Sequence, residues 1–336
     1  MTKRLVLHAA AMLVVIFVVG RDVSAWNPTG HRTIASMMFR RLSHERAMEL
    51  AELLRAHPRF EEDFISAMPA AIESADRELQ AEWLFQQASC WPDIVRGGPP
   101  ERKAFDRPFW HYLPRGYYLT DAPVEFRSQV DTSFNSDLTP VGGAENENLN
   151  GPQALKVNLA VVYNSAAAAA DRAVALCWVL HIAQDLHQPC HTASLCTPKM
   201  FPEGDRGANW IPTTQLRNLH AVWDSPLGSD DRFEVCRNLA ILMLGNAQEQ
   251  LSEIEVCEID SEVEKWMAEG LELADSAVYT AEVRHMVVTA DSVQTVDLTP
   301  EYLRAVRAVA DRRLLLAGVR LSALLDAREC SLVTPP

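Results

Sequence analysis

The stretch Trp178-Val-Leu-His181-Ile-Ala-Gln-Asp185-Leu-His187-Gln-Pro189-Cys-His191 places three histidines and one aspartate within eleven residues. His181 and Asp185 are four residues apart, so a helix would carry both side chains on one face, close enough to bind one ion. The apolar run at 173–182 predicts that this helix is buried. We therefore expect the fold to form around this helix and its polar end.

Pro189 marks the end of that helix, because proline cannot continue an α-helix and restricts the residue before it. We expect the helix to end near His187 and the next turn to bring His191 back beside it. Buried polar side chains must be hydrogen-bonded or bound to metal. Hydrogen-bonded core histidines are one interpretation, but imidazole with carboxylate is the ligand set of hydrolytic zinc, which favours a metal site. Cys190 could add a ligand, although a small buried apolar residue is the preferred interpretation.

The first residues have the pattern of a secretory signal. Lys3 and Arg4 form a charged start, 5–20 is an apolar middle, and 23–25 is a small-residue cleavage site. A membrane anchor is the alternative, but the apolar run is short for a span. Cleavage would make Trp26 the mature N-terminus, and no later segment is long and apolar enough to cross a bilayer.

Removing residues 1–25 leaves 311 of the 336 residues, 26–336, which is enough for one large domain or two ordinary ones. The removed piece contains three basic residues and one acidic residue, so the net charge changes from −14 to −16. Such an acidic surface argues against tight nucleic-acid binding by charge neutralisation along the backbone. It does not exclude an enzyme whose positive charge is supplied locally by metal ions.

The chain has seven cysteines and no CxxC motif. Export permits disulfide bonds, but an odd number leaves at least one thiol unpaired. The cysteines are Cys90, Cys177, Cys190, Cys196, Cys236, Cys257 and Cys330.

Helical periodicity and high helix propensity extend through most of the chain, with no alternating strand pattern, internal repeat or clear linker. One mostly helical, all-α domain is therefore expected. Loops are expected at 115–153 and 197–212, where Gly, Pro and Asn are frequent. The alanine run at 166–170 is expected to support a long helical region. The expected helices are 31–56, 71–88, 152–187, 216–225, 231–251, 261–280 and 301–327.

Other candidate ligands are weak when taken singly. His220-Ala-Val-Trp-Asp224 repeats the His-xxx-Asp spacing, and it is either a surface helix pair or, given Trp223, a buried one. Trp91-Pro-Asp93, Trp110-His111-Tyr112 and His31 are each more often structural than functional. The histidines in charged or loop contexts are expected to be solvated: His44, His57 and His285.

Together these pieces resemble the S1/P1 nucleases over 26–325. The similarity includes Trp26 after the signal, Gly30-His31, Trp91-Pro-Asp93 with Arg96, Trp110-His111, the His181–His191 stretch, Gly204-Asp-Arg-Gly-Ala-Asn209, Asn218-Leu-His220-xx-Trp-Asp224, and Leu315-Ala-Gly-Val-Arg-Leu-Ser-Ala-Leu-Leu325. The resemblance implies a mainly helical fold with three zinc ions in a cleft. One zinc would take Asp93, His111, His181 and Asp185. A second would take His191, His220 and Asp224, and the third the amine and carbonyl of Trp26 with His31 and Asp185.

The resemblance also implies hydrolysis of single-stranded DNA or RNA and of 3′-nucleotides to 5′-phosphorylated products. Arg96 would act with Asp93 and Asp185 as a catalytic residue and stabilise charge on the phosphoryl oxygens. Tyr112 would stack an unpaired base. Fungal members have an Asp two positions beyond that aromatic, where this chain has Pro114, so base preference is expected to be weak.

Asn209 and His187 resemble supporting residues, and Asn209 is also a candidate for substrate binding. The chain is expected to be a secreted or periplasmic monomer with no stable membrane association after processing. A zinc-dependent phospholipase C is the nearest alternative, but that family has His-xxx-Glu where this chain has His220-xxx-Asp224. A secreted metal-binding protein without catalysis is the other alternative.

Overall fold

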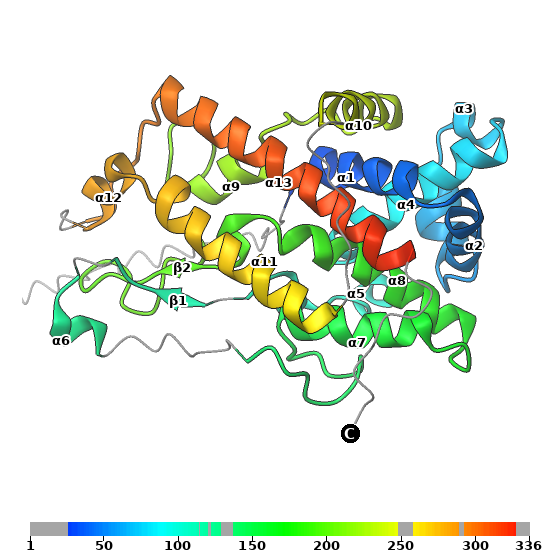
Figure 1. Ribbon diagram of the computed structural model, residues 1–336, viewed down its shortest axis with the longest axis horizontal. Coiled ribbons are helices and arrows are strands. Elements are labelled where there is room, and N and C mark those ends of the chain that lie inside the picture. The colour runs from blue at the N-terminus through cyan, green and yellow to red at the C-terminus, as the bar shows by residue number, and fades with distance from the viewer. Residues whose placement is uncertain are drawn as a thin grey trace, which may run out of the picture.

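The computed structural model describes residues 26–113, 115–119, 122–128, 137–247, 258–288 and 292–326, and it is all-α apart from one very short strand pair. Figure 1 shows the helices gathered around α8, with α13 crossing the molecule diagonally. The helices are α1 Pro28–Arg41, α2 His44–Leu54, α3 Ala70–Glu73, α4 Arg77–Ile94, α5 Pro100–Lys103, α6 Val124–Arg127, α7 Gly151–Tyr163, α8 Ala169–Asp185, α9 Leu219–Asp224, α10 Phe233–Ala247, α11 Ile259–Leu273, α12 Ala281–Val288 and α13 Pro300–Asp326. Single-turn segments are η1 Phe60–Phe64, η2 Ile65–Ala67, η3 Pro108–His111, η4 Pro189–His191 and η5 Ala274–Val278, and the strands are β1 Gly116–Tyr117 and β2 Ser194–Leu195.

Helix α8 is the centre of the packing, as its apolar run predicts. It contacts α7, α4, α2 and α13, while α1 packs against α4, α10 and α13. Every residue from Ala175 to Asp185 is buried, so this helix has no solvent-facing side along its second half. Large side chains such as Trp83, Trp91 and Trp178 fill the core around it. Burial of apolar area is the main favourable term in folding, and these large aromatic side chains contribute to it.

The helix expected at 31–56 is wrong as one element, because the structure divides it. Helix α1 ends at Arg41, and Ser43 begins α2 by accepting a hydrogen bond from the backbone N–H of Arg46 at 3.4 Å. A serine at this position satisfies a free N–H group and favours a new start over continuation. The break turns α2 away from α1 (Figure 1).

The expected helix 152–187 is also two helices, and the alanine run 166–170 lies at the break between them. Asn164 ends α7, and its side-chain oxygen accepts a hydrogen bond from the N–H of Ala166 at 3.0 Å. Asparagine competes with the helix by bonding nearby backbone groups, which here outweighs the helix propensity of alanine.

The helix expected at 71–88 corresponds to α4, which begins and ends about six residues later, at Arg77 and Ile94. Asp76 caps α4 by accepting from Leu79 N at 2.9 Å, and the helix continues through Pro92 to Ile94. The remaining expected helices correspond to α9, α10, α11 with η5, and α13. Helix α12 and the pairing of β1 with β2 were not predicted.

His57 is buried, with 3% of its surface exposed, so the expectation that it is solvated is wrong. Its ring lies 4.4 Å from the Trp91 ring, and burial lowers its pKa to about 4. Cysteines 90, 177, 190, 196 and 236 are buried free thiols, and the described ranges contain no disulfide bond. No described helix has the length and apolar character needed to cross a membrane. The signal at 1–25, Pro114, Cys257 and Cys330 lie outside the described residues.

Candidate metal centre

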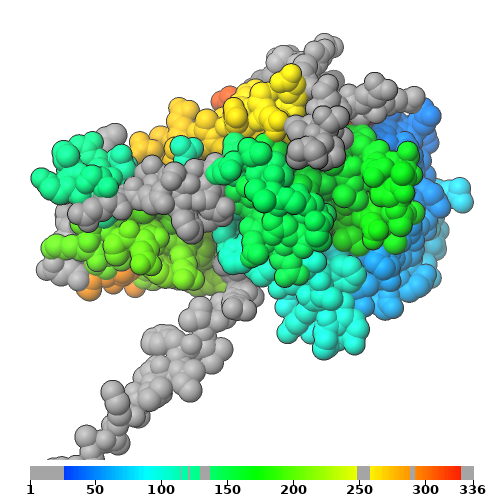
Figure 2. All heavy atoms as spheres, turned by 90° about the horizontal axis from the view of Figure 1, so that it is seen from below, coloured from blue at the N-terminus to red at the C-terminus, as the bar shows by residue number. Residues whose placement is uncertain are grey.

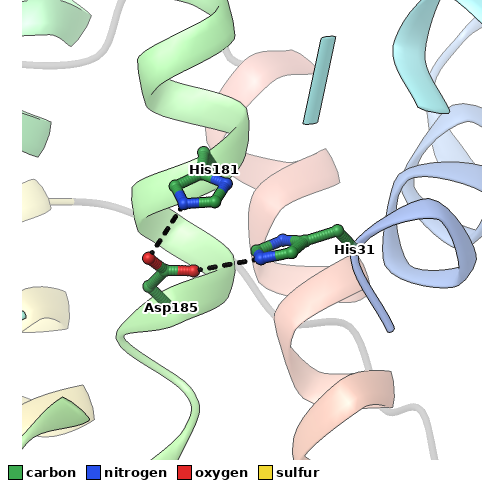
Figure 3. A group of neighbouring side chains, drawn as sticks. All are labelled: His31, His181 and Asp185. Atoms are coloured by element: carbon green, nitrogen blue, oxygen red, sulfur yellow. Dashed lines mark ion pairs between the residues drawn. The ribbon is translucent and has the colours of Figure 1, made fainter. Parts of the chain in front are cut away.

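The last turn of α8 carries His181 and Asp185 on one face, as their spacing predicts. The Asp185 Oδ2 atom lies 3.1 Å from His181 Nε2, and its Oδ1 atom lies 3.4 Å from Nε2 of His31 on α1 (Figure 3). All three side chains are fully buried. Helices α1 and α8, which are far apart in the sequence, therefore each place a histidine nitrogen beside one oxygen of Asp185.

His111 and Asp93 complete this group. His111, at the end of η3, places its Nδ1 atom 3.3 Å from Asp185 Oδ2. Asp93, in the last turn of α4, places Oδ1 3.8 Å from both His111 Nδ1 and His181 Nε2. We call His31, Asp93, His111, His181 and Asp185 the first group. Their ligand atoms form two overlapping sets close enough to hold a metal ion each.

A second group lies beside the first and consists of His191, His220 and Asp224. The Nε2 atoms of His191 and His220 are 3.0 Å apart, and His220 Nε2 is 3.4 Å from Asp224 Oδ2. His220 is 1% exposed and Asp224 is 4% exposed, so the His-xxx-Asp pair of α9 is buried rather than on the surface. Asn218 positions this pair by capping α9 through Ala221 N at 2.8 Å.

Four of the five histidine rings are oriented by a hydrogen bond from Nδ1. This bond fixes the tautomer and leaves an unprotonated Nε2 atom directed at the group. The acceptors are Gln184 Oε1 for His31 at 2.7 Å, Ser89 O for His181 at 2.8 Å, His111 O for His191 at 2.6 Å and Gly207 O for His220 at 2.6 Å. Such second contacts are typical of histidines that ligate metals.

The electrostatics of the first group also fit a bound cation. Burial lowers the pKa of His31 to about 3, and it lowers the pKa of His181, so both rings are neutral near pH 7. Burial, followed by repulsion from Asp93, raises the pKa of Asp185 well above its usual value. Neither oxygen of Asp185 accepts a hydrogen bond, although buried carboxylates need a partner. A metal ion between these nitrogen and oxygen atoms would satisfy all of them.

Trp26 and Asn27 are bonded to residues in or next to the two groups. Its side chain is fully buried, and its indole N–H donates to the carbonyl of Gln184 at 3.0 Å. The next residue, Asn27, donates its backbone N–H to Asp224 O at 2.9 Å. These bonds anchor the start of the described chain between α8 and α9.

Arg96 and Tyr112 lie next to residues of the first group, and Asn209 lies next to the helix that carries the second. The Arg96 Nη1 atom is 3.6 Å from Asp93 Oδ1, and its side chain is 17% exposed. Tyr112 is half-buried next to His111. Asn209 donates its side-chain amide to Arg206 O at 3.0 Å and accepts from Asn218 Nδ2 at 3.2 Å, which is consistent with a supporting role.

Two glutamines with positioning contacts were missed from the sequence. Gln184 accepts from His31, and Gln188 donates its amide N–H to Asp224 Oδ1 at 2.7 Å. The signal available in the sequence was their position, since Gln184 precedes the candidate ligand Asp185 and Gln188 precedes Pro189. His187 faces away from both groups, since its Nδ1 atom donates to Ala183 O and its Nε2 atom accepts from Arg320.

A comparison with protein families gives a match over most of the chain. The family model described as S1/P1 Nuclease matches residues 26–328, which is nearly the whole chain. A search of curated proteins found no match.

Proposed function

Because the chain belongs to the S1/P1 nuclease family, we propose that it is a zinc-dependent hydrolase of single-stranded nucleic acids and 3′-nucleotides, and that its products carry 5′-phosphates. The observation that carries this proposal is Asp185, a buried carboxylate with imidazole nitrogens on both oxygens and no hydrogen-bond donor on either. Nitrogen and oxygen donors without a thiolate are the set that hydrolytic zinc uses.

Three zinc ions are proposed, with Asp185 shared by two of them. The ligands would be His31, Asp93, His111, His181, Asp185, His191, His220 and Asp224. The family resemblance adds Trp26, through its free amine and carbonyl. When bound, zinc supplies Lewis-acid chemistry: it polarises a phosphoryl oxygen and lowers the pKa of water.

The chain's own residues bind and orient the phosphate. The Arg96 guanidinium stands at the rim of the first group, where it can donate hydrogen bonds to non-bridging phosphoryl oxygens and stabilise their charge. Because the imidazoles of His31 and His181 are neutral near pH 7, their Nε2 atoms are free to bind a metal ion.

Single-strand preference is proposed from Tyr112. An aromatic ring next to His111 can stack a base only when the face of that base is free of a neighbour. Paired bases in a duplex are stacked on both faces, so they would bind poorly. Since Pro114 has no side-chain acceptor, discrimination among the bases is expected to be weak.

The proposal includes export and removal of residues 1–25. The bonds that hold the start of the described chain support it, because the Trp26 indole donates to Gln184 and the Asn27 backbone donates to Asp224, a candidate ligand. Activity would then begin only after processing.

The experiment is a comparison of substrates with the mature protein starting at Trp26. Single-stranded DNA or RNA should be cut faster than duplex, and 3′-AMP should release phosphate. Products bearing a 3′-phosphate, or a phosphatidylcholine rate above the nucleotide rate, would refute the nuclease assignment. Elemental analysis of protein purified without chelator should give three zinc ions, and no turnover of any substrate with zinc bound would favour a non-catalytic metal-binding protein.

A further inference from the structure

The loop at 204–211 carries Arg206 and Trp210, which belong to neither group of candidate ligands. The guanidinium of Arg206 lies 4.8 Å from the centre of the Trp210 ring, in a cation–π contact. Trp210 is still 45% exposed, an unusual state for so large an aromatic ring. Its backbone N–H donates to Asp205 O at 3.2 Å, and its ring lies 6.3 Å from that of the buried Phe201, so it is anchored at the surface.

This loop is held in one conformation and tied to the second group. Arg206, Gly207 and Ala208 all have positive φ, at 57°, 61° and 65°. A Cβ atom at Gly207 would lie 2.1 Å from Cys190 O, so only glycine fits there. The same Gly207 carbonyl accepts the hydrogen bond from His220 Nδ1 at 2.6 Å. Arg206 is therefore one residue away from the carbonyl that orients a candidate ligand.

The charge of Arg206 is available to a ligand. No salt bridge joins it to a carboxylate in the part of the chain that the structure describes. In a chain of net charge −14, an exposed arginine without an acidic partner beside the site needs an explanation. Figure 2 shows the yellow-green segment that includes residues 200–217 on the surface, at the end of the molecule opposite the blue and cyan helices.

We propose that Arg206 and Trp210 form a second nucleotide subsite. A nucleotide of the single strand, other than the one at Tyr112, stacks its base on Trp210, and its phosphate binds the Arg206 guanidinium. Stacking on an aromatic ring accepts any base, and a guanidinium binds phosphate through paired hydrogen bonds. This inference rests on the proposed nuclease function and predicts that oligonucleotides bind more tightly than mononucleotides.

The test measures binding and turnover separately in the zinc-containing protein. Fluorescence anisotropy with a phosphorothioate-linked thymidine decamer gives Kd, while kcat and KM are measured for the ordinary decamer and for 3′-AMP. Trp210→Ala should raise Kd about tenfold or more, the effect of losing one stacked base. Arg206→Asn should raise Kd. It should also lower the slope of log Kd against log salt concentration by about 0.7, because one phosphate contact is lost. Asparagine is chosen because it tolerates the positive φ at this position.

Both variants should raise KM for the decamer, leave its kcat near that of the wild type, and turn over 3′-AMP normally. Trp210→Phe should recover most of the lost binding, because phenylalanine still stacks. Matched controls are Leu242→Ala, an apolar side chain that is 61% exposed, and Arg232→Ala, with a side chain that is 74% exposed; both should bind as the wild type does.

The failures are distinguishable. A wild-type protein that cleaves and binds the decamer, with Trp210→Ala and Arg206→Asn unchanged in Kd and salt slope, would overturn the subsite alone. A wild-type protein that neither cleaves nor binds the decamer would overturn the proposed function and the subsite with it.

Discussion

The two groups of candidate ligands differ in how their buried carboxylates are already used. Asp185 in the first group has no hydrogen-bond donor on either oxygen, and imidazole nitrogens approach both. Asp224 in the second group gives Oδ1 to the amide of Gln188, which leaves only Oδ2 near His220. A carboxylate with two free oxygens can bind two cations, one on each oxygen, whereas a carboxylate with one free oxygen can bind only one cation in this way. We therefore expect Asp185 to be shared by two metal ions and Asp224 to bind one.

Asp185→Asn is expected to have the largest effect. The amide keeps the shape of the side chain but removes the charge that two adjacent cations need between them. Activity on single-stranded DNA should fall by more than about 10³-fold, the upper end of the loss for one charge-stabilising group. Elemental analysis should show that more than one zinc ion is lost.

Asp224→Asn is the matched variant, since it makes the same change in the second group. Its activity should fall less, and it should lose one zinc ion. Equal residual rates and equal zinc contents in the two variants would show that Asp185 is not shared and would remove the contrast between the groups.

An extra glycine before Trp26 is expected to have the next largest effect. The nitrogen of Trp26 then belongs to a planar amide without a basic lone pair, while a free N-terminus has a pKa of about 7.7–8.0 and can ligate zinc when deprotonated. The extended protein should lose one zinc ion, and its activity should fall about 10²-fold while the helical fold is kept. Circular dichroism and zinc analysis of the two forms provide the measurement, and full zinc content in the extended form would contradict an N-terminal ligand.

Gln184→Ala and Gln188→Ala test how the two groups are oriented. Alanine at 184 keeps the carbonyl that binds the Trp26 indole but removes the oxygen that fixes His31 Nδ1. Zinc affinity of the first group should fall about 10–100-fold, as for other residues that orient ligands. Alanine at 188 should weaken the second group instead. Retention of zinc against a competing chelator measures both, and wild-type retention in Gln184→Ala would show that this oxygen does not position the site.

The helix end at Pro189 and the placing of His181 with Asp185 could be predicted from the sequence, since both depend on local geometry. The meeting of His31, Asp93 and His111 with Asp185 is a tertiary contact between α1, α4, η3 and α8. The periodicity of the sequence does not show which helices meet. The expected ligand set came instead from the resemblance to the S1/P1 nucleases.

The orientation of the histidine rings could not be predicted for a different reason. Three of the four acceptors are backbone carbonyls, of Ser89, His111 and Gly207, and every residue has a carbonyl. The same limit explains the wrong helix at 152–187, where one asparagine side chain outweighed a run of alanines. Competing local hydrogen bonds of similar strength decide such positions, and propensity sums do not resolve them.

The final prediction concerns the ion-paired support around His187, which faces away from both groups, and it has the smallest expected effect on activity. Glu269 accepts hydrogen bonds from Arg313 and Arg320, and these two arginines also contact His187, at the carbonyl and at Nε2. Burial alone would raise the pKa of Glu269, but the bonds from Arg320 and Arg313 outweigh it and lower the pKa to about 2.

Glu269→Gln should therefore change stability while kcat stays within about twofold of the wild type, because Glu269 contacts neither group. At pH 7 the free energy of unfolding should fall by about 2 kcal/mol, a value reduced for the partial exposure of Glu269. The folded pKa is depressed, so the stabilisation is complete above the ordinary pKa of 4.5 and is lost as the pH falls toward 2. Urea unfolding at several pH values should show the difference between the two proteins shrinking across this window. Loss of zinc in acid affects both proteins alike, so a difference that stayed constant down to pH 2 would mean that the charge of Glu269 does not stabilise this support.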